Sequence, residues 1–161
     1  VGAVAAGQVD IGVVAAEGDF GELEVTPYRR DRLVLIVPTT HPLAQQQEIA
    51  FADVLAEAFV CLHAGSAIHT FMMNHAARLG GRLDVRIQVR SFAAVCRMVG
   101  AGVGIGMVPR SSVAASDLLH TVEIADTWAP RDLHLCVRER AALGPAAQAL
   151  FDHLAAMGGT G

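Results

Sequence analysis

The strongest constraint in the sequence is a series of short apolar runs separated by Gly, Pro and polar residues. The clearest run is Leu33–Val37, five aliphatic residues that stop at Pro38. An uninterrupted apolar run of this length is typical of a strand buried on both faces, and a proline cannot donate to the strand ladder. Between the runs, apolar residues recur at three- and four-residue spacing, which indicates amphipathic helices. The pattern predicts an α/β fold in which helices alternate with mainly parallel strands.

Turn residues divide the chain into predicted elements. We expect strands at Ile11–Ala15, Leu23–Tyr28, Leu33–Val37, Ala58–Leu62, Val85–Arg90, Val103–Val108, Leu119–Ile124 and Leu133–Arg138. The first should be covered on both faces, and the second should be an edge strand that stops around Pro27. We expect helices at Phe51–Leu55, Ser66–Leu79, Phe92–Ala101 and Pro145–Met157, with Ser91 as an N-cap, and the tail of a helix at Val1–Gly7.

The charge and the cysteines exclude several classes of protein. The net charge is −4, and the basic residues are all Arg and are spread along the chain. DNA binding needs a clustered positive surface, so we do not expect this chain to bind DNA by itself. Cys61, Cys96 and Cys136 each lie in an apolar run, which indicates buried, reduced thiols in a cytoplasmic protein. No apolar stretch reaches about 18 residues, so we expect no membrane span.

Two patterns suggest a cofactor, but their context does not support one. Gly100–Gly106 is rich in glycine, yet it follows a predicted helix and enters a strand, the reverse of a dinucleotide-binding loop. It predicts a tight helix-to-strand turn. His63, His69 and His75 recur every six residues, which places them on different helix faces, whereas metal ligands need a spacing of three or four. We therefore expect no nucleotide, no metal and no other cofactor.

The sequence shows no recognisable catalytic set. Ser66 and the three cysteines are potential nucleophiles, but no Gly-x-Ser-x-Gly elbow is present. Asp10, Asp31, Asp53 and Glu57 lie at element ends, where carboxylates usually cap helices or face solvent. We predict that the chain is not an enzyme.

The segment Ala64–Ser66 opens a helix directly after a buried strand. The first N–H groups of a helix are unpaired and the helix dipole favours negative charge, so an anion could bind here without a charged side chain. An ordinary Ser N-cap without a ligand explains the same residues. From the residues alone, both interpretations stay open.

Three stretches, taken in order, resemble a known family. They are Ala6–Val14, then Leu33–Pro38 running into His41–Ala44, and then Val99–Pro109. In their order and spacing they are similar to the effector-binding domain of LysR-type bacterial transcription regulators, and the resemblance extends over about residues 1–157.

The resemblance implies an architecture like that of type II periplasmic binding proteins, with two α/β lobes joined by two crossover strands. Lobe I would comprise residues 1–37 and 118–157, lobe II residues 38–117, and residues 158–161 would be a disordered tail. The crossings would fall near Val37–Pro38 and Leu118–Leu119. The family domain usually has further N-terminal elements, so lobe I would be incomplete in this chain.

The resemblance also implies a function. A small polar or anionic metabolite would bind in the cleft between the lobes, without catalysis. DNA would be bound only through an N-terminal domain outside this chain, by a cytoplasmic homodimer or homotetramer with no membrane contact. The cleft residues carried over from the family are Ala15, Ala16, His63, Ala64, Gly65, Ser66, Gly102 and Val103. Some relatives have a Thr at the position of Ala15, so the identity of the effector cannot be carried over.

Two alternatives share the two-lobe architecture. One is an enzyme that acts on a small molecule, which would need a general base or nucleophile where Ala15 and Ala16 stand. The other is an exported solute-binding protein, which three free cysteines argue against.

Overall fold

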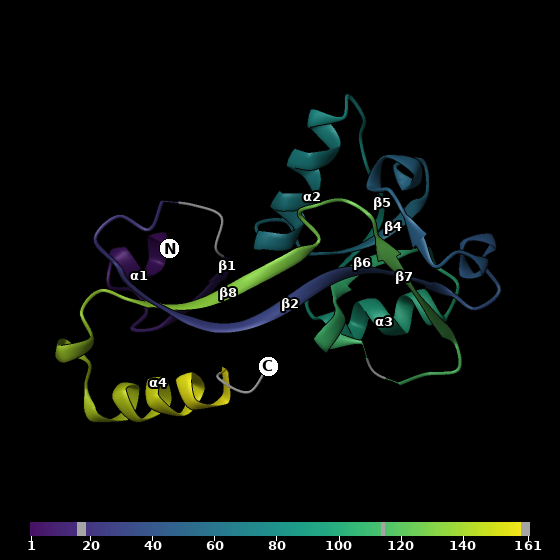
Figure 1. The fold of residues 1–161 in the computed structure, drawn as a ribbon. Helices are drawn as coiled ribbons and strands as arrows, with labels where there is room; N and C mark the ends of the chain where they lie inside the picture. The colour runs from purple at the N-terminus through teal and green to yellow at the C-terminus, as the bar shows by residue number, and fades with distance from the viewer. Residues whose placement is uncertain (16–18, 114, 159–161) are drawn as a thin grey trace. The chain divides into compact units, whose positions relative to one another are not determined.

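The computed structural model describes residues 1–15, 19–113 and 115–158 (Figure 1). The chain forms two compact units: unit 1 comprises Val1–Asp31 and Pro130–Gly161, and unit 2 comprises Arg32–Ala129. The chain enters unit 2 within the long strand β2 (Glu24–Pro38) and returns to unit 1 at the start of β8 (Pro130–Val137). Unit 1 is therefore built from two separate segments of the sequence.

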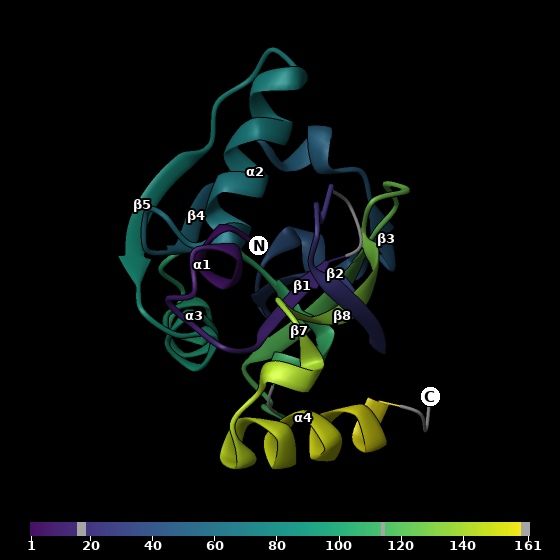
Figure 2. The same cartoon turned by 90° about the vertical axis from the view of Figure 1, so that its left-hand side faces the viewer.

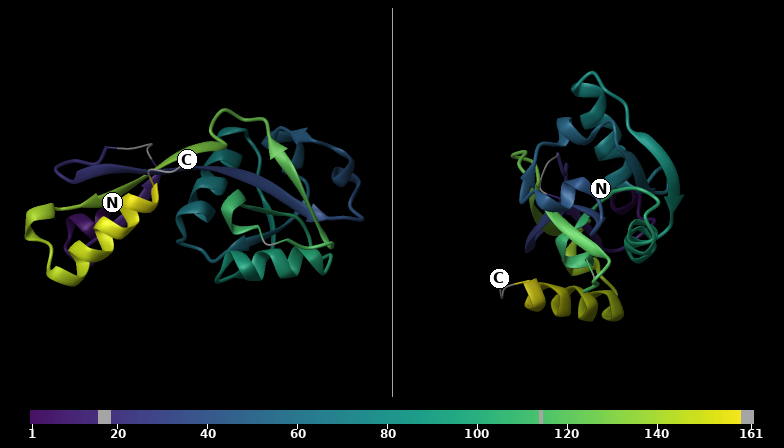
Figure 3. Two further views of the ribbon diagram at one scale, coloured as in Figure 1. Left: turned by 60° about the horizontal axis from the view of Figure 1, so that its bottom comes forward. Right: turned by 90° about the vertical axis from the view of Figure 1, so that its right-hand side faces the viewer.

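Unit 1 is a small antiparallel arrangement with helices at its ends. Strand β8 lies between β1 (Gly12–Ala15) and β2, and Gly12 pairs with Cys136 in the antiparallel register of β1 and β8. The other elements are α1 (Gly2–Ala5), the short helix η4 (Arg140–Ala142) and α4 (Pro145–Gly158), the yellow helix near the C-terminus in Figure 3. Leu135, Val137 and Phe151 form its buried core.

Unit 2 combines two kinds of strand pairing. The second half of β2 pairs antiparallel with both β6 (Gly106–Pro109) and β7 (Leu119–Ile124), and β3 (Glu48–Ile49) adds to β7 in parallel. Strands β4 (Ala58–Leu62) and β5 (Asp84–Val89) form a parallel pair, and they lie side by side in Figure 2. The helices are α2 (Ala67–Arg78), α3 (Phe92–Gly100), η1 (Pro42–Gln45), η2 (Phe51–Val54) and η3 (Arg110–Ser112).

The apolar run of β2 is the centre of unit 2. All five residues of Leu33–Val37 are fully buried. Side chains alternate along a strand, so Leu33, Leu35 and Val37 join one core cluster, and Val34 and Ile36 join another. The prediction of a strand buried on both faces is confirmed for this segment.

Several other predicted elements are confirmed. Helices α2, α3 and α4 lie where apolar spacing places them, and strands β4, β5 and β7 match their predicted segments closely. The burial of β5 alternates between exposed and half-buried residues, as the sequence predicts. The fold class is α/β, as expected.

Three local predictions are wrong. The predicted edge strand at Leu23–Tyr28 does not stop around Pro27; it continues into Leu33–Val37 as one strand of 15 residues. Pro27 is tolerated because it is exposed, where a strand can lack a donor. Strand β1 is not covered on both faces, since Val13 is 52% exposed. The strands are also not mainly parallel, because β2 is antiparallel to both β6 and β7, and β1 is antiparallel to β8.

The boundaries of the units differ from the expected crossings. They fall at Asp31/Arg32 and Ala129/Pro130, not near Val37–Pro38 and Leu118–Leu119. The reason is that the apolar half of β2 and all of β7 are hydrogen-bonded to each other and to strands of unit 2. Gly158 ends α4, and residues 159–161 of the expected tail lie outside the described residues.

Candidate functional site

The carboxyl ends of three strands meet at one edge of unit 2. Strands β4 and β5 are parallel, with Leu62 opposite Val89 at their ends. Strand β6 runs in the same direction as β4, since Phe59 and Ile105 form a parallel bridge. Ile105 N donates to the Ala58 carbonyl and Val60 N donates to the Ile105 carbonyl, both at 2.8 Å. The loops after β4, β5 and β6 therefore leave from the same edge, where open α/β sheets usually bind ligands.

The loop after β4 is His63–Ser66, and its backbone is held in a turn. His63 N donates to the Val89 carbonyl of β5 at 2.9 Å, and Ser66 N donates to the His63 carbonyl at 3.1 Å. Gly65 has φ +90°, a conformation that residues with a side chain rarely adopt. The loop is thus anchored to β5 at its first residue and turned by the glycine into the start of α2.

Ser66 is the N-cap of α2. Its Oγ accepts a hydrogen bond from His69 N at 3.3 Å, while its O–H can still donate. The expected N-cap is confirmed. The cap leaves the remaining first-turn N–H groups of a 12-residue helix pointing out of its N-terminus, where the dipole favours negative charge.

Gln88 of β5 connects this loop to α2. Its Oε1 accepts from Ala64 N at 3.4 Å, and its Nε2 lies 3.3 Å from His69 Nε2. For this amide to donate, Nε2 of His69 must carry no hydrogen. The sequence signals Gln88 only as a polar residue on the exposed face of an alternating strand, so its bridging position was not predicted.

The loop after β5 contains a second capped helix start. Ser91 Oγ accepts from Ala94 N at 3.2 Å, which makes Ser91 the N-cap of α3, as the sequence predicts. The sequence pattern predicts for Ser91 a cap and no further role. Because β5 is the parallel neighbour of β4, Ser91 follows a strand end directly beside the one that Ser66 follows.

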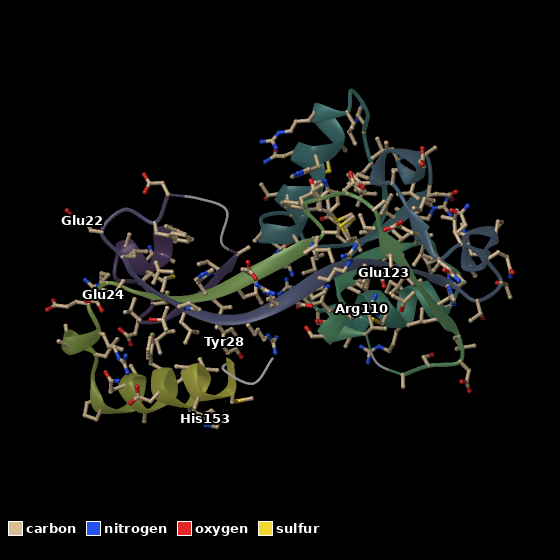
Figure 4. All side chains as sticks on the ribbon, viewed as in Figure 1. Glu22, Glu24, Tyr28, Arg110, Glu123 and His153 are labelled. Carbon is tan, nitrogen blue, oxygen red and sulfur yellow. The ribbon has the colours of Figure 1, made fainter. Side chains whose placement is uncertain are left out.

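The segment after β6 carries charge. Arg110 is the first residue beyond β6 and forms an ion pair through Nη2 with Glu123 Oε1 of β7. The other carboxylate oxygen of Glu123, Oε2, lies 2.9 Å from Arg32 Nε. Figure 4 labels Arg110 and Glu123, which lie close together in unit 2. A single arginine after a proline carries no sequence signal, and this group was missed.

The residues carried over from the family are not all at this edge. His63, Ala64, Gly65 and Ser66 form the loop just described, whereas Ala15 is the last residue of β1 in unit 1, opposite Leu133 of β8. Ala16 lies outside the described residues.

Gly102 and Val103 lie at the other end of the strands. They close α3, with Gly102 N donating to the Val99 carbonyl at 2.8 Å and Val103 N to the Met98 carbonyl at 3.1 Å. They precede Ile105, which pairs with Phe59 near the start of β4. At 3.3 Å per residue, this is roughly 20 Å from the loop that follows Leu62. The structure does not bring them to His63–Ser66, because a helix-to-strand turn enters a parallel strand at its amino end.

The turn conformation and close packing explain why glycines stand at positions 102, 104 and 106, in the stretch that is as rich in glycine as a nucleotide-binding loop. Gly102 has φ +80°, as a turn that closes a helix requires. A methyl group at Gly104 would overlap the carbonyl oxygen of Ala58, and one at Gly106 would lie 2.7 Å from Val95 Cγ1. The predicted tight helix-to-strand turn is confirmed.

His75 packs against aromatic rings, and the three cysteines are buried. His75 stacks at 4.0 Å from Phe71 and 5.0 Å from Trp128, measured between ring centroids. Across residues 1–15, 19–113 and 115–158, no group of three His, Cys, Asp or Glu side chains could hold a metal ion. The three cysteines are buried, and burial raises the pKa of the Cys61 thiol to about 11.

None of the described helices is long and apolar enough to cross a membrane.

Comparison with known proteins agrees with this geometry. The family model for the LysR substrate binding domain matches residues 1–158. The HTH-type transcriptional regulator CysL of Bacillus subtilis is 31% identical over 113 residues, which are 70% of this chain and 38% of that protein. A probable RuBisCO transcriptional regulator of Trichormus variabilis is 30% identical over 160 residues, 94% of this chain and 48% of that protein. The chain thus spans less than half the length of these relatives.

Solved structures show the same fold. The regulatory domain of Synechocystis CcmR in complex with 2-PG superposes with a TM-score of 0.80 at 22% identity, over 99% of this chain and 78% of that one. The effector binding domain of QuiR in complex with shikimate gives 0.77 at 19% identity, over 98% and 76%.

The fold is therefore the periplasmic-binding-protein-like α/β fold of effector-binding domains. The chain belongs to the LysR substrate-binding domain family of transcription regulators.

Proposed function

We propose that this chain senses a small polar or anionic metabolite. The part of the binding site that belongs to unit 2 would be the edge formed by His63–Ser66 and Ser91. One observation carries the proposal: two capped helix N-termini follow the adjacent ends of the parallel strands β4 and β5. Helices of 12 and 9 residues present unpaired N–H groups there, with dipoles that favour negative charge.

The relatives support a ligand of this kind. The solved domain of CcmR holds 2-PG, and that of QuiR holds shikimate. A small ligand on a preformed edge needs few polar groups for orientation, and the Ser66 O–H together with the amides of Gly65 and Ala67 supplies them. Ala15 of unit 1 joins this proposal only through the family resemblance, and the proposed edge does not include Gly102 or Val103.

In the intact regulator, we propose that the ligand acts by its higher affinity for one arrangement of the protein. DNA would be bound by another part of the full-length protein, in a cytoplasmic homodimer or homotetramer. The chain would use no cofactor and catalyse no reaction.

A substitution at Ser66 separates binding from folding. Asp is as good an N-cap as Ser, so Ser66→Asp should keep α2 capped while placing a carboxylate where the ligand's negative charge would lie. Ser66→Asn is the matched control, since Asn caps equally well and is uncharged. We expect Ser66→Asp to lose binding of shikimate or 2-PG in calorimetry, and Ser66→Asn to retain it.

Thermal unfolding checks the fold of both variants, because a ligand that binds only the native state raises the transition temperature. Equal affinity of Ser66→Asp and the unaltered chain would contradict the assignment of the site. A chain stabilised by none of a panel of small carboxylates and phosphates would contradict the proposed function itself.

A further inference from the structure

One carboxylate in unit 2 serves two guanidinium groups. Glu123 Oε2 contacts Arg32 Nε at 2.9 Å, and Glu123 Oε1 contacts Arg110 Nη2. Arg32 also donates from Nη2 to the Ile124 carbonyl at 2.7 Å. Arg32 is thus held by both the side chain and the backbone of β7, whereas Glu123 is the only ion-pair partner of Arg110 among the described residues.

Arg110 is the more accessible of the two arginines. Its side chain is 49% exposed, compared with 33% for Arg32 and 36% for Glu123. A guanidinium has five N–H donors in a planar fork that matches two oxygens of a carboxylate or phosphate. Glu123 offers Arg110 one oxygen, because its other oxygen faces Arg32, so the fork of Arg110 is only partly used.

The position of Arg110 connects it with the proposed site. It directly follows β6, and β6 runs parallel to β4 through the Phe59–Ile105 bridge. Counting from that bridge, Val108 stands level with Leu62, so Arg110 leaves the same edge of unit 2 as His63–Ser66. All of these residues belong to unit 2.

The surrounding segment has few negative charges that could compete. Between Ala58 and Ser116 the sequence has one acidic residue, Asp84. The same segment carries several arginines, namely Arg78, Arg82, Arg86, Arg90, Arg97 and Arg110. Of these arginines, Arg90 directly follows β5 and so leaves the same edge of unit 2 as Arg110.

We propose that Arg110 is the residue that selects for a negatively charged effector, and that Glu123 is its internal counter-ion, with which the effector's carboxylate or phosphate competes. The proposal rests on the proposed function and adds the ligand class to it: a small carboxylate or phosphate in place of a neutral polar molecule. It has an unusual consequence, namely that removal of a protein carboxylate should tighten binding of an anion.

Three variants test this with shikimate and its uncharged methyl ester as probes. Arg110→Gln should weaken shikimate binding by about tenfold or more, because a charge-assisted hydrogen bond is lost, and should leave the ester unaffected. Glu123→Gln should tighten shikimate binding by about three- to tenfold, because Arg110 is released from its partner.

Glu48→Gln is the matched control. Glu48 of β3 stands opposite Glu123 in the parallel register of β3 and β7, so it gives the same change of charge in the same sheet without an ion pair to Arg110. We expect it to change the affinity for shikimate by less than twofold. A Glu123→Gln variant that binds shikimate no more tightly than Glu48→Gln would overturn the proposal.

A second readout does not depend on any variant's folding. In the ¹⁵N-labelled chain, inorganic phosphate should move the Nε–Hε NMR signal of Arg110 at lower concentration than those of Arg86 and Arg97. An Arg110 signal that moves no earlier than these two would overturn the inference.

The backbone amides separate this inference from the proposed function. Shikimate that shifts the amides of Gly65 and Ala67 without affecting Arg110 would overturn the role of Arg110 and leave the proposed function intact. A panel of small carboxylates and phosphates in which no compound shifts either amide would contradict the proposed function, whatever happens at Arg110.

Discussion

Unit 1 and unit 2 bury their apolar residues in different ways. In unit 1, the described core cluster consists of Leu135, Val137 and Phe151, with half-buried neighbours around it. In unit 2, both faces of β2 are covered, and each face has its own cluster of buried residues. Since burial of apolar surface is the main stabilising term in folding, unit 2 should be the more stable of the two.

The same difference decides which unit can hold a precise site. In unit 2 the strand ends belong to the parallel strands β4 and β5, of which β4 has a buried centre, and the helices that follow them are capped by serines. Binding groups on rigid elements keep their geometry better than groups on loops. Unit 1 leaves Val13 of β1 exposed and has a smaller core. The comparison predicts that the two units respond differently to similar substitutions.

The largest loss of stability is expected when either of two buried phenylalanines is truncated to Ala. Phe59 in unit 2 and Phe151 in unit 1 are 0% and 1% exposed, and truncation of either to Ala should cost about 3–5 kcal/mol in its own unit. Trp128, the single tryptophan, lies in unit 2 against Phe51 and Phe71. Urea unfolding followed by Trp128 fluorescence should therefore shift strongly in Phe59→Ala and little in Phe151→Ala. An equal shift in both would show that the units unfold together.

A smaller loss of stability is expected when either of two glycines is replaced by Ala. A methyl group at Gly104 would overlap the backbone oxygen of Ala58, which cannot move without breaking the β4 pairing. At Gly12 its two nearest neighbours would be side-chain atoms, Cys136 Sγ at 2.8 Å and Val4 Cγ2 at 2.9 Å, and the nearest backbone atom, the Cys136 carbonyl oxygen, would lie at an ordinary contact distance of 3.9 Å. We expect Gly104→Ala to cost about 3 kcal/mol and Gly12→Ala about 1 kcal/mol. The midpoints of thermal unfolding test this order, and the reverse order would mean that unit 1 is the more rigid.

The third prediction concerns the cap of α3. Ser91→Ala removes the acceptor of the Ala94 N–H and should destabilise unit 2 by about 1 kcal/mol. Ser91→Asn should restore most of this loss. Amide hydrogen exchange in α3 measures the effect residue by residue, and α4 in unit 1 serves as the internal reference. Unchanged exchange in the first turn of α3 would contradict the capping role.

The smallest effect is expected at Asp152 in unit 1. Hydrogen bonds from Gln148 and Arg140 lower the pKa of this carboxyl below its ordinary value of 3.8. A lowered pKa means that the ionised group stabilises α4 above pH 3.8 and that this contribution is lost as the pH falls through the lowered value. Asp152→Asn should therefore open α4 slightly more often at neutral pH and have no effect at the acid end.

Hydrogen exchange in α4 at neutral and acidic pH measures this difference. Asp132→Asn is the control, because Asp132 pairs with Arg30 on the strands and not with α4. A pH-independent difference between the Asp152 variant and the unaltered chain would mean that the loss comes from the side-chain contacts and not from the charge.

Much of the local structure could be predicted because its causes are local. The caps at Ser66 and Ser91 need only a hydroxyl and a following helix, and both were found. The glycine-rich turn before β6 was also found, because its position between a helix and a strand can be seen in the pattern. The strand end predicted at Pro27 is wrong, because whether a proline interrupts a strand depends on whether its position needs a donor.

The candidate site was only partly predicted. The strand-to-helix context of His63–Ser66 is visible in the sequence and leads to this loop as a proposed site, but Gly102 and Val103, which the family resemblance assigns to the same site, lie at the opposite end of the strands. The direction of β6 relative to β4 decides this, and no local pattern records it. Arg32, Arg110 and Glu123 come from three separate segments, so their shared ion pairs depend on the pairing of β2 with both β6 and β7.

The sequence by itself determined that the run Leu33–Val37 is buried, where helices α2 and α3 begin, and the family to which the chain is similar. These follow from side-chain hydrophobicity and from hydrogen bonds between near neighbours, which act over a few residues. The tertiary structure alone decided which strand ends share an edge and which charges meet there. Strand order, direction and register are set by pairing between distant segments, and a sequence pattern that repeats every two residues does not distinguish one partner from another.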